Sequence, residues 1–243
     1  MILALETATT ACSAALCAAE GSVVAGRLEL GGPAHSRLLL PFVRDVLEEA
    51  GAGWDDVDTV AVGLGPGAFT GLRIGIATAR ALAQADGRAG LAGVPTLTAL
   101  ALALADAPEA AGRGLVPLID GRRREVFAAV FERDGGVIRQ VEDVSVVRAD
   151  DLCAWLAARG DVVTGGDGAA LYADLLPASA QPAAGIVAPT AAMVGRAAAA
   201  GAPGLVHGPD TVLPVYGRAP DARPRAAGSA ASSEATPAPG GAA

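Results

Sequence analysis

The sequence predicts an α/β protein made of two similar domains that face one another. The main observation is an internal repeat, because two segments between residues 3 and 138 align without a gap at a constant offset of 114 residues. The offset places Glu6 on Asp120 and Gly21 on Gly135, and each copy reads as an apolar strand ending in a carboxylate, followed by two further strands. A unit of this length does not fit a solenoid, whose units have roughly 20–50 residues.

The composition excludes several classes of protein. The chain has 243 residues, 52% of them hydrophobic, which suffices for a sizeable core. Its net charge of −8 disfavours RNA binding by the average surface. All 18 basic residues are Arg, which excludes a Walker-type phosphate loop and a Schiff-base mechanism, since both require Lys. Cys12, Cys17 and Cys153 lack metal-ligand spacing, and we expect all three to be buried in a reduced protein. No signal peptide or membrane-spanning segment is expected, which predicts a soluble cytoplasmic protein.

The expected elements follow the repeat. In the first copy we expect strands at 1–5, 13–18, 23–30 and 57–63, and helices at 36–50, 70–85 and from 97 to 105. In the second copy we expect strands at 115–120, 126–133 and 137–147, and the segments 162–168 and 187–190 echo 60–67 and 94–96. The predicted organisation is a first domain at 1–106, a second at 107–188, a helix and extended segment at 189–218 that pack back on the first domain, and a disordered tail at 219–243.

The helix at 70–85 carries small residues every four positions. Gly71, Gly75, Ala79 and Ala83 would leave a groove with almost no side chains along one side of the helix. Glycine inside a helix costs about 0.5–1 kcal/mol relative to alanine, so another backbone is expected to pack very close. Either the chain's own sheet or a helix of a partner fills the groove. Arg73 and Arg80 would flank it and pair with a partner's carboxylates.

A second candidate site combines the repeated carboxylates. Glu6 and Asp120 would face the cleft between the domains and hold Mg²⁺ and nucleotide phosphates, with hydroxyls from Thr7, Thr9 and Thr10, or they would only cap turns. His35 and His207 are too isolated to predict a metal site. Residues 122–124, three arginines, read as a solvated hairpin tip or as a contact for RNA phosphates.

Four segments resemble a known family. They are ILALETAT at 2–9, HSRLL at 35–39, GPGAFTGLRIG at 65–75 and PVYGR at 214–218, and in order and spacing they are similar to the signature segments of the TsaB family, also called YeaZ. The resemblance covers residues 1 to about 218. It implies a duplicated actin-like, sugar-kinase-type fold (ASKHA) with two subdomains, each having a mixed sheet and flanking helices. It also implies a role in making N6-threonylcarbamoyladenosine next to the anticodon of tRNAs that read codons starting with A.

The resemblance further implies a scaffold subunit without catalytic residues, metal or a required cofactor. In that system the catalytic paralogue TsaD transfers the threonylcarbamoyl group, the ATPase TsaE supports turnover, ATP or ADP is bound by the complex, and tRNA is reached through the complex. The chain alone is expected to form a homodimer. The helix at 96–105 offers no imidazole where the catalytic paralogue carries paired histidines. The expected contacts with TsaD are His35, Leu38, Phe42, Phe69, Gly71, Leu72, Arg73, Gly75, Ile76, Ala79 and Arg80.

The chain departs from the family pattern at three positions. Glu6 replaces the usual Asp, Ala68 the usual Ser, and Gly217 a bulkier apolar residue.

Two other functions are alternatives to the scaffold role. The first is a free-standing ATP-dependent small-molecule kinase of the sugar-kinase type that uses Glu6 and Asp120. The second, a standalone RNA-binding module, is disfavoured by the acidic charge and by an aromatic content of only 3%.

Overall fold

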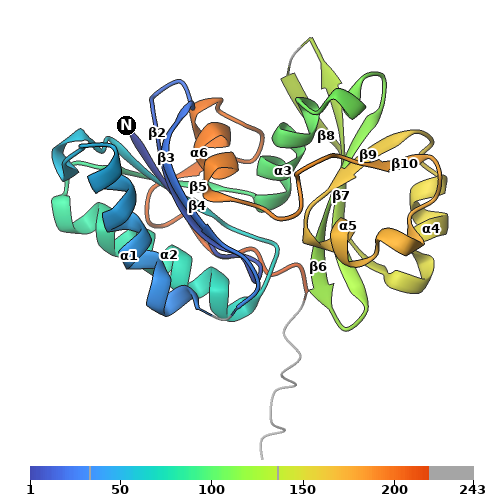
Figure 1. The fold of residues 1–243 in the computed structure, drawn as a ribbon, viewed down its shortest axis with the longest axis horizontal. Helices are drawn as coiled ribbons and strands as arrows, with labels where there is room; N and C mark the ends of the chain where they lie inside the picture. Colours follow the sequence, from blue (N-terminus) through green and yellow to red (C-terminus); the bar gives the residue numbers. More distant parts are fainter. Residues whose placement is uncertain (33, 136, 219–243) are drawn as a thin grey trace, which may run out of the picture.

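The computed structural model describes residues 1–32, 34–135 and 137–218. The tail at 219–243, predicted to be disordered, lies outside the described residues. Two lobes lie side by side, each built on one sheet (Figure 1). The first sheet contains β1 (Ile2–Glu6), β2 (Cys12–Cys17), β3 (Val23–Glu29), β4 (Thr59–Gly63), β5 (Gly90–Val94) and β11 (Val206–His207). The second contains β6 (Gly114–Arg122), β7 (Glu125–Asp134), β8 (Val137–Arg148), β9 (Val162–Gly165) and β10 (Ala180–Pro182).

The strand order confirms the duplication. The first sheet has the order β11-β5-β4-β1-β2-β3 and the second has β10-β9-β6-β7-β8, so each β-meander occupies the same place in its sheet. In both sheets the first strand pairs antiparallel with the second and parallel with the fourth. This is the duplicated actin-like fold that the repeat and the family resemblance predict, with two mixed sheets and flanking helices.

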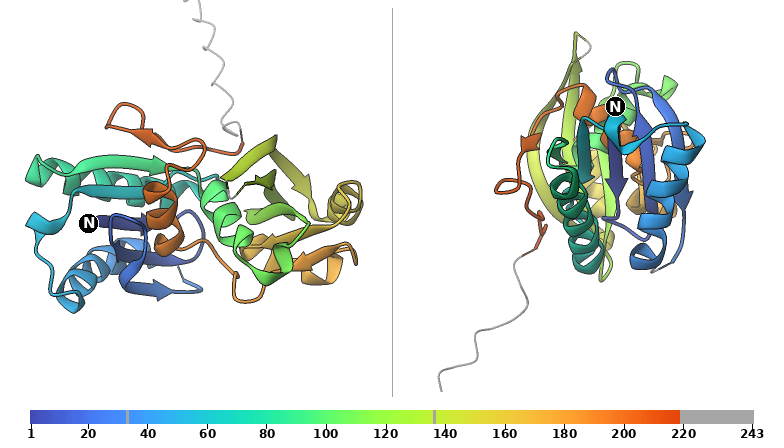
Figure 2. Two further views of the ribbon diagram at one scale, coloured as in Figure 1. Left: turned by 90° about the horizontal axis from the view of Figure 1, so that it is seen from above. Right: turned by 90° about the vertical axis from the view of Figure 1, so that its left-hand side faces the viewer.

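The helices repeat as well. They are α1 (His35–Glu49), α2 (Phe69–Asp86) and α3 (Thr96–Ala105), followed by α4 (Ala149–Ala157), α5 (Asp167–Leu171) and α6 (Ala191–Ala199). α1 and α2 cover the outer face of the first sheet, and α4 and α5 cover the corresponding face of the second. α6 covers the inner face of the first sheet and α3 that of the second, and these two helices pack on each other between the lobes (Figure 2).

The boundaries of the predicted strands and helices agree with the structure to within two or three residues, but α4 and the strands β5, β10 and β11 were not predicted. Shifting α1 by the repeat offset of 114 would have placed α4. Cys153, expected to be buried, is exposed on α4, whereas Cys12 and Cys17 are buried and desolvation raises the pKa of each thiol to about 11. α3 lies within the first domain predicted at 1–106, yet Leu97, Leu100 and Leu104 pack into the core of the second lobe.

Candidate functional site

The small-residue stripe of α2 faces this chain's own first lobe. A Cβ atom added to Gly71 would lie 2.1 Å from the carbonyl oxygen of Thr7, and one added to Gly75 would lie 2.2 Å from the hydroxyl oxygen of Thr7. The Thr7 hydroxyl donates a hydrogen bond to the Gly71 carbonyl at 2.9 Å. Ala79 and Ala83 continue the stripe and are buried in the core of the same lobe. Of the two alternatives that the sequence left open, the stripe is filled from within the chain, by the turn after β1, so the interpretation that a partner's helix fills the groove is wrong.

This packing changes which of the expected partner contacts are accessible. His35, Gly71, Leu72, Gly75, Ile76 and Ala79 are all buried within the chain. The His35 ring, for example, lies 3.2 Å (Nε2) from the carbonyl oxygen of Ala11. Arg80 donates hydrogen bonds to the carbonyl oxygens of Pro209 and Val212 at 2.6 and 2.7 Å, so it holds the C-terminal segment. Leu38, Phe42, Phe69 and Arg73 keep exposed surface, and their contact with a partner stays a prediction.

An apolar strip lies where α1 and α2 meet on the outer surface of the first lobe. Leu38 and Phe42 of α1 and Ile74 and Leu82 of α2 are each only partly buried and pack against the first-lobe core; we call these four residues the α1–α2 seam. Sequence reasoning placed Leu38 and Phe42 there but chose Leu72 and Ile76 from α2 instead of Ile74 and Leu82. The signal was present, since Ile74 and Leu82 belong to the row of positions directly beside the glycine stripe.

The first of the repeated carboxylates is buried in the first lobe. Glu6 Oε1 accepts a hydrogen bond from the backbone N–H of Ala8 at 2.6 Å, and Glu6 Oε2 accepts one from the hydroxyl of Thr96 at 3.0 Å. The side chain is inaccessible to solvent and packs against Gly63, where an added Cβ atom would lie 2.1 Å from Oε2. Burial raises its pKa from 4.5 to about 7 in spite of these bonds. Glu6 thus caps the β1–β2 turn, with neither oxygen left open to the cleft.

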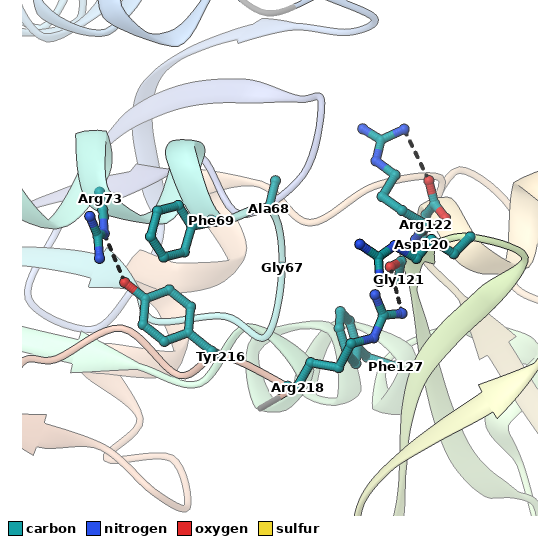
Figure 3. A pocket seen from close by; sticks show the side chains of 12 residues that line it. Gly67, Ala68, Phe69, Arg73, Asp120, Gly121, Arg122, Phe127, Tyr216 and Arg218 are labelled. Carbon is teal, nitrogen blue, oxygen red and sulfur yellow. Dashed lines mark hydrogen bonds and ion pairs between the residues drawn. The ribbon is translucent and has the colours of Figure 1, made fainter. Parts of the chain in front are cut away.

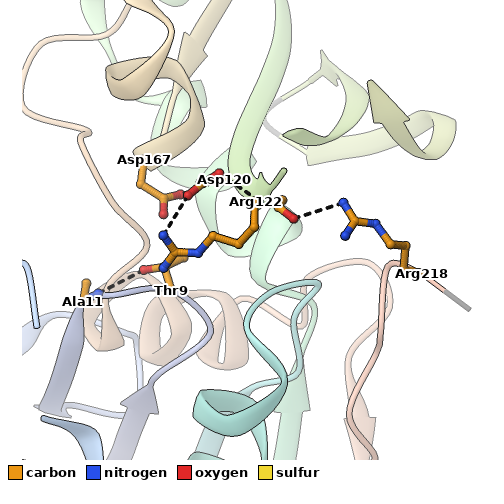
Figure 4. A network of polar contacts seen from close by, with 7 residues as sticks. Thr9, Ala11, Asp120, Arg122, Asp167 and Arg218 are labelled. Atoms are coloured by element: carbon orange, nitrogen blue, oxygen red, sulfur yellow. Dashed lines mark hydrogen bonds and ion pairs between the residues drawn. The ribbon is translucent and has the colours of Figure 1, made fainter. Parts of the chain in front are cut away.

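The second carboxylate makes the matching bond in the second lobe. Asp120 Oδ1 accepts from the backbone N–H of Arg122 at 2.8 Å, and Asp120 Oδ2 lies 3.2 Å from the Arg122 guanidinium (Figure 4). Asp167, which sequence analysis gave no role, accepts a hydrogen bond from the backbone N–H of Asp120 at 3.1 Å. Desolvation, with a smaller contribution from Asp120, raises the pKa of Asp167 to about 6.

These contacts leave little of the predicted nucleotide site. Thr7 and Thr9 are buried, with their hydroxyls bonded to Gly71 and to the backbone N–H of Ala11. Among the described residues, no group of three or more His, Cys, Asp or Glu side chains is arranged to hold a metal ion. The residues present in this conformation do not fit a magnesium nucleotide, because the Glu6 carboxylate is buried inside the first lobe and the Asp120 carboxylate is paired with Arg122.

A different opening between the lobes is lined by basic and aromatic residues. This interlobe cleft has a volume of about 630 Å³ and lies between the glycine turn before α2, the β6–β7 hairpin and the C-terminal segment (Figure 3). On the first-lobe side, Phe69 stacks on Tyr216 with ring centroids 5.1 Å apart, and Arg73 lies over Phe69 and bonds to the Tyr216 hydroxyl at 3.0 Å. The other lining residues are Gly67, Ala68, Asp120, Gly121, Arg122, Arg123, Phe127, Gly217 and Arg218.

The C-terminal segment ties the two lobes together beside this cleft. The backbone N–H of Val215 donates to the Leu64 carbonyl in the first lobe at 2.8 Å. Arg218 then reaches the second lobe, where it donates to the Gly121 carbonyl at 3.1 Å and pairs with Glu125. Gly217 is confined between them, since an added Cβ would lie 2.4 Å from the Phe127 ring. A bulkier residue at this position would need a wider spacing of the lobes.

Comparison with known proteins identifies the family. The family model described as "TsaD: tRNA N6-adenosine threonylcarbamoyltransferase" matches residues 29–175. The chain is 38% identical over 176 residues to the tRNA threonylcarbamoyladenosine biosynthesis protein TsaB of Escherichia coli, which covers 72% of this chain and 74% of that protein. The chain belongs to the TsaB family.

Other members of the TsaB family and their relatives extend the similarity over nearly the whole chain. An uncharacterized protein of Mycobacterium tuberculosis is 36% identical over 228 residues, which are 93% of this chain and 95% of that protein. The solved structure of YeaZ from Pseudomonas aeruginosa superposes with a TM-score of 0.71 at 34% identity and covers 88% of this chain and 98% of that one. The two-lobed fold is therefore the fold of TsaB-type proteins.

Two of the four TsaB signature segments meet at the interlobe cleft. The turn at 65–75 supplies Phe69 and Arg73, and the segment at 214–218 supplies Tyr216 and Arg218. Sequence reasoning used these segments to recognise the family but did not place Tyr216 and Arg218 at a site, because nothing local indicates that residue 216 lies beside residue 69. None of the helices in the described part of the chain is both long and apolar enough to span a membrane.

Proposed function

We propose that this chain is the scaffold subunit of a tRNA N6-adenosine threonylcarbamoyltransferase and acts by binding the catalytic paralogue TsaD. Membership of the TsaB family supports the role in threonylcarbamoyladenosine biosynthesis. The match of residues 29–175 to the TsaD family model supports a paralogous pair that shares one fold and so presents equivalent helices to each other.

The observation that carries the proposal is the α1–α2 seam. Seam residues Leu38, Phe42, Ile74 and Leu82 are all partly exposed and pack against the first-lobe core, whereas the more exposed Leu40 of α1 and Phe69 of α2 lie outside the seam. A partly exposed apolar strip on paired helices is typical of a protein interface. We assign the seam to contact with TsaD in the complex and with a second copy when the chain is alone. We also propose that the protein acts in the cytoplasm, and that it meets TsaE and tRNA as part of the complex.

A non-catalytic role agrees with the chemistry of the described residues. α3 offers only Thr, Leu and Ala side chains, all but two of its residues being buried, so it has no group that would ligate a metal or transfer a proton. Nucleotide binding is assigned to the assembled complex, because Glu6 is sealed in this chain and Asp120 is paired with Arg122. The same geometry disfavours the rival small-molecule kinase.

Reconstitution tests the proposal. The purified chain is mixed with TsaD and TsaE of the same species, the enzyme that supplies threonylcarbamoyl-AMP, and unmodified tRNA, and the modified nucleoside is quantified by mass spectrometry. We expect modification only when this chain is present, and no ATP consumption by the chain alone. Full modification without the chain, or robust turnover by the chain with a small alcohol, would contradict the proposal.

A further inference from the structure

The interlobe cleft concentrates positive charge in an acidic protein. Four of its lining residues are arginines, namely Arg73, Arg122, Arg123 and Arg218, against the single lining carboxylate Asp120, whereas the whole chain has a net charge of −8. Phe69, Phe127 and Tyr216 add apolar surface between these cations. A concave site with one sign of charge and low-dielectric walls attracts ligands of the opposite sign.

Three of these arginines keep part of their hydrogen-bonding capacity unused. Arg73 donates from Nε to Tyr216, Arg122 pairs with Asp120 through Nη1, and Arg218 bonds to Gly121 and Glu125 through Nη2. The other two guanidinium nitrogens of each side chain have no hydrogen-bond partner among the described residues. In Arg73 they are Nη1 and Nη2, and in Arg122 they are Nε and Nη2. Both pairs are adjacent nitrogens that form the fork for bidentate binding of an oxyanion.

The aromatic residues are not arranged to stack a nucleotide base. One face of Phe69 is covered by Arg73, whose guanidinium carbon lies 3.8 Å from the ring centroid, and Tyr216 stacks on the same ring. Phe127 is buried, with Gly217 packed against its edge. Recognition of single-stranded nucleic acid uses free ring faces on which bases stack. The cleft instead offers the partly exposed Tyr216 ring beside two guanidinium forks.

We propose that the interlobe cleft is the docking site for an acidic peptide segment of a partner protein. Carboxylates of the segment bind the forks of Arg73 and Arg122, with Arg218 as a third cation, and its aliphatic groups lie against Phe69 and Tyr216 (Figure 3). The occupant follows from charge complementarity and from the contacts that cover Phe69 and bury Phe127. This surface is separate from the α1–α2 seam, so the inference goes beyond the proposed function. Phe69 and Arg73 are also among the expected contacts with TsaD, whereas Arg122 and Arg218 are not, so Arg122→Gln tests the cleft independently of TsaD binding.

Fluorescence anisotropy with a fluorescein-labelled hexaglutamate peptide tests this inference on the full-length chain. We expect saturable binding with a Kd below about 1 mM in low salt, and no binding of labelled hexaglutamine. Arg122→Gln and Arg73→Gln are each expected to weaken binding tenfold or more. The matched controls Arg139→Gln and Arg148→Gln remove exposed, ion-paired arginines of the second lobe outside the cleft and are expected to leave binding unchanged.

A second measurement does not depend on any variant being folded. In the wild-type protein, hexaglutamate is expected to shift the backbone amide resonances of Gly67, Gly121 and Gly217, which line the cleft, and not that of Gly26 on β3. Loss of binding in the control variants to the same extent as in the cleft variants would overturn the proposal. So would tenfold tighter binding of hexauridylate RNA or of ATP with displacement of the peptide, which would identify a phosphate ligand instead.

Discussion

The hydroxyl oxygen of Thr7 occupies the space beside Gly75, 2.2 Å from where a Cβ atom on that glycine would lie. The same hydroxyl donates to the Gly71 carbonyl, so one threonine after β1 fills the stripe that both glycines leave on α2. The close approach that the glycines permit is thus made within the first lobe. This packing joins the β1–β2 turn to α2. The neighbouring row of α2, with Ile74 and Leu82, is the part that we assign to the partner interface.

Gly75→Ala is therefore expected to destabilise the free chain. Overpacking of a filled site costs about 1–3 kcal/mol, which exceeds the gain of about 0.5–1 kcal/mol from placing alanine in a helix. Urea unfolding followed by circular dichroism measures the change. The matched control is Gly26→Ala on β3, where the nearest atom to an added Cβ lies 3.9 Å away. A Gly75→Ala chain as stable as the wild type would show that Thr7 does not fill the stripe.

The buried Glu6 carboxyl predicts a pH dependence of stability. Because its pKa in the folded chain is about 7 against an ordinary 4.5, the folded state holds this proton in a pH range where the unfolded state has released it. The free energy of unfolding is therefore expected to fall as pH rises from about 4.5 to 7. One pKa unit corresponds to about 1.4 kcal/mol, so the loss from this group is about 3 kcal/mol.

Glu6→Gln isolates this effect, since glutamine imitates the protonated acid and retains an oxygen for the Ala8 N–H. The difference in unfolding free energy between variant and wild type is expected to increase in favour of the variant as pH rises through this window. Asp167, whose pKa is also raised, acts in the same direction in both proteins, so its own contribution largely cancels in the difference; its repulsion of Glu6 is the smallest cause of the Glu6 shift. A difference that does not vary between pH 4.5 and 8 would contradict the assignment.

The pair of Arg218 and Glu125 is expected to couple the lobes measurably. Their side chains are 30% and 24% exposed, so a double-mutant cycle with Arg218→Gln and Glu125→Gln is expected to give a coupling energy of about 1 kcal/mol. The pair of Arg139 and Glu132 is more exposed, at 70% and 59%, and serves as a control with an expected value below about 0.5 kcal/mol. Equal coupling energies in the two cycles would contradict the claim that the pair of Arg218 and Glu125 links the lobes.

The fold could be predicted from the sequence largely because it is duplicated. The correspondence of Glu6 with Asp120 extends to the hydrogen bonds that the two acids accept, from Ala8 and from Arg122, which are again 114 residues apart. Apolar periodicity and turn residues located most strands, since these are local signals. α4 was not predicted because, past β8, the repeat was followed only through the segments 162–168 and 187–190 and not through the counterpart of α1.

The site was harder to predict, since it depends on which sequence-distant segments meet. A glycine stripe indicates close packing but does not identify what packs there, so the choice between Thr7 and a partner helix required coordinates. The repeated carboxylates likewise suggested an open cleft, yet Thr96 and Ala8 bind Glu6 inside the lobe. Tyr216 joins Phe69 only because the C-terminal segment returns along β4 and α2.

The α1–α2 seam can be tested with two substitutions on one helix. Phe42→Asp places a charge in the seam, whereas Leu40→Asp places the same charge at an exposed leucine that lies on the opposite flank of α1. Both variants are first compared with the wild type by thermal unfolding, and Ile74→Asp on α2 provides an independent seam variant.

Titration calorimetry of these proteins with TsaD of the same species tests the central claim most directly. We expect the wild type and Leu40→Asp to bind with equal affinity, and Phe42→Asp and Ile74→Asp to bind at least tenfold more weakly, because each buries an unpaired charge in the interface. Wild-type affinity of both seam variants, or the absence of any complex with TsaD, would contradict the claim that this chain is a scaffold that docks through α1 and α2.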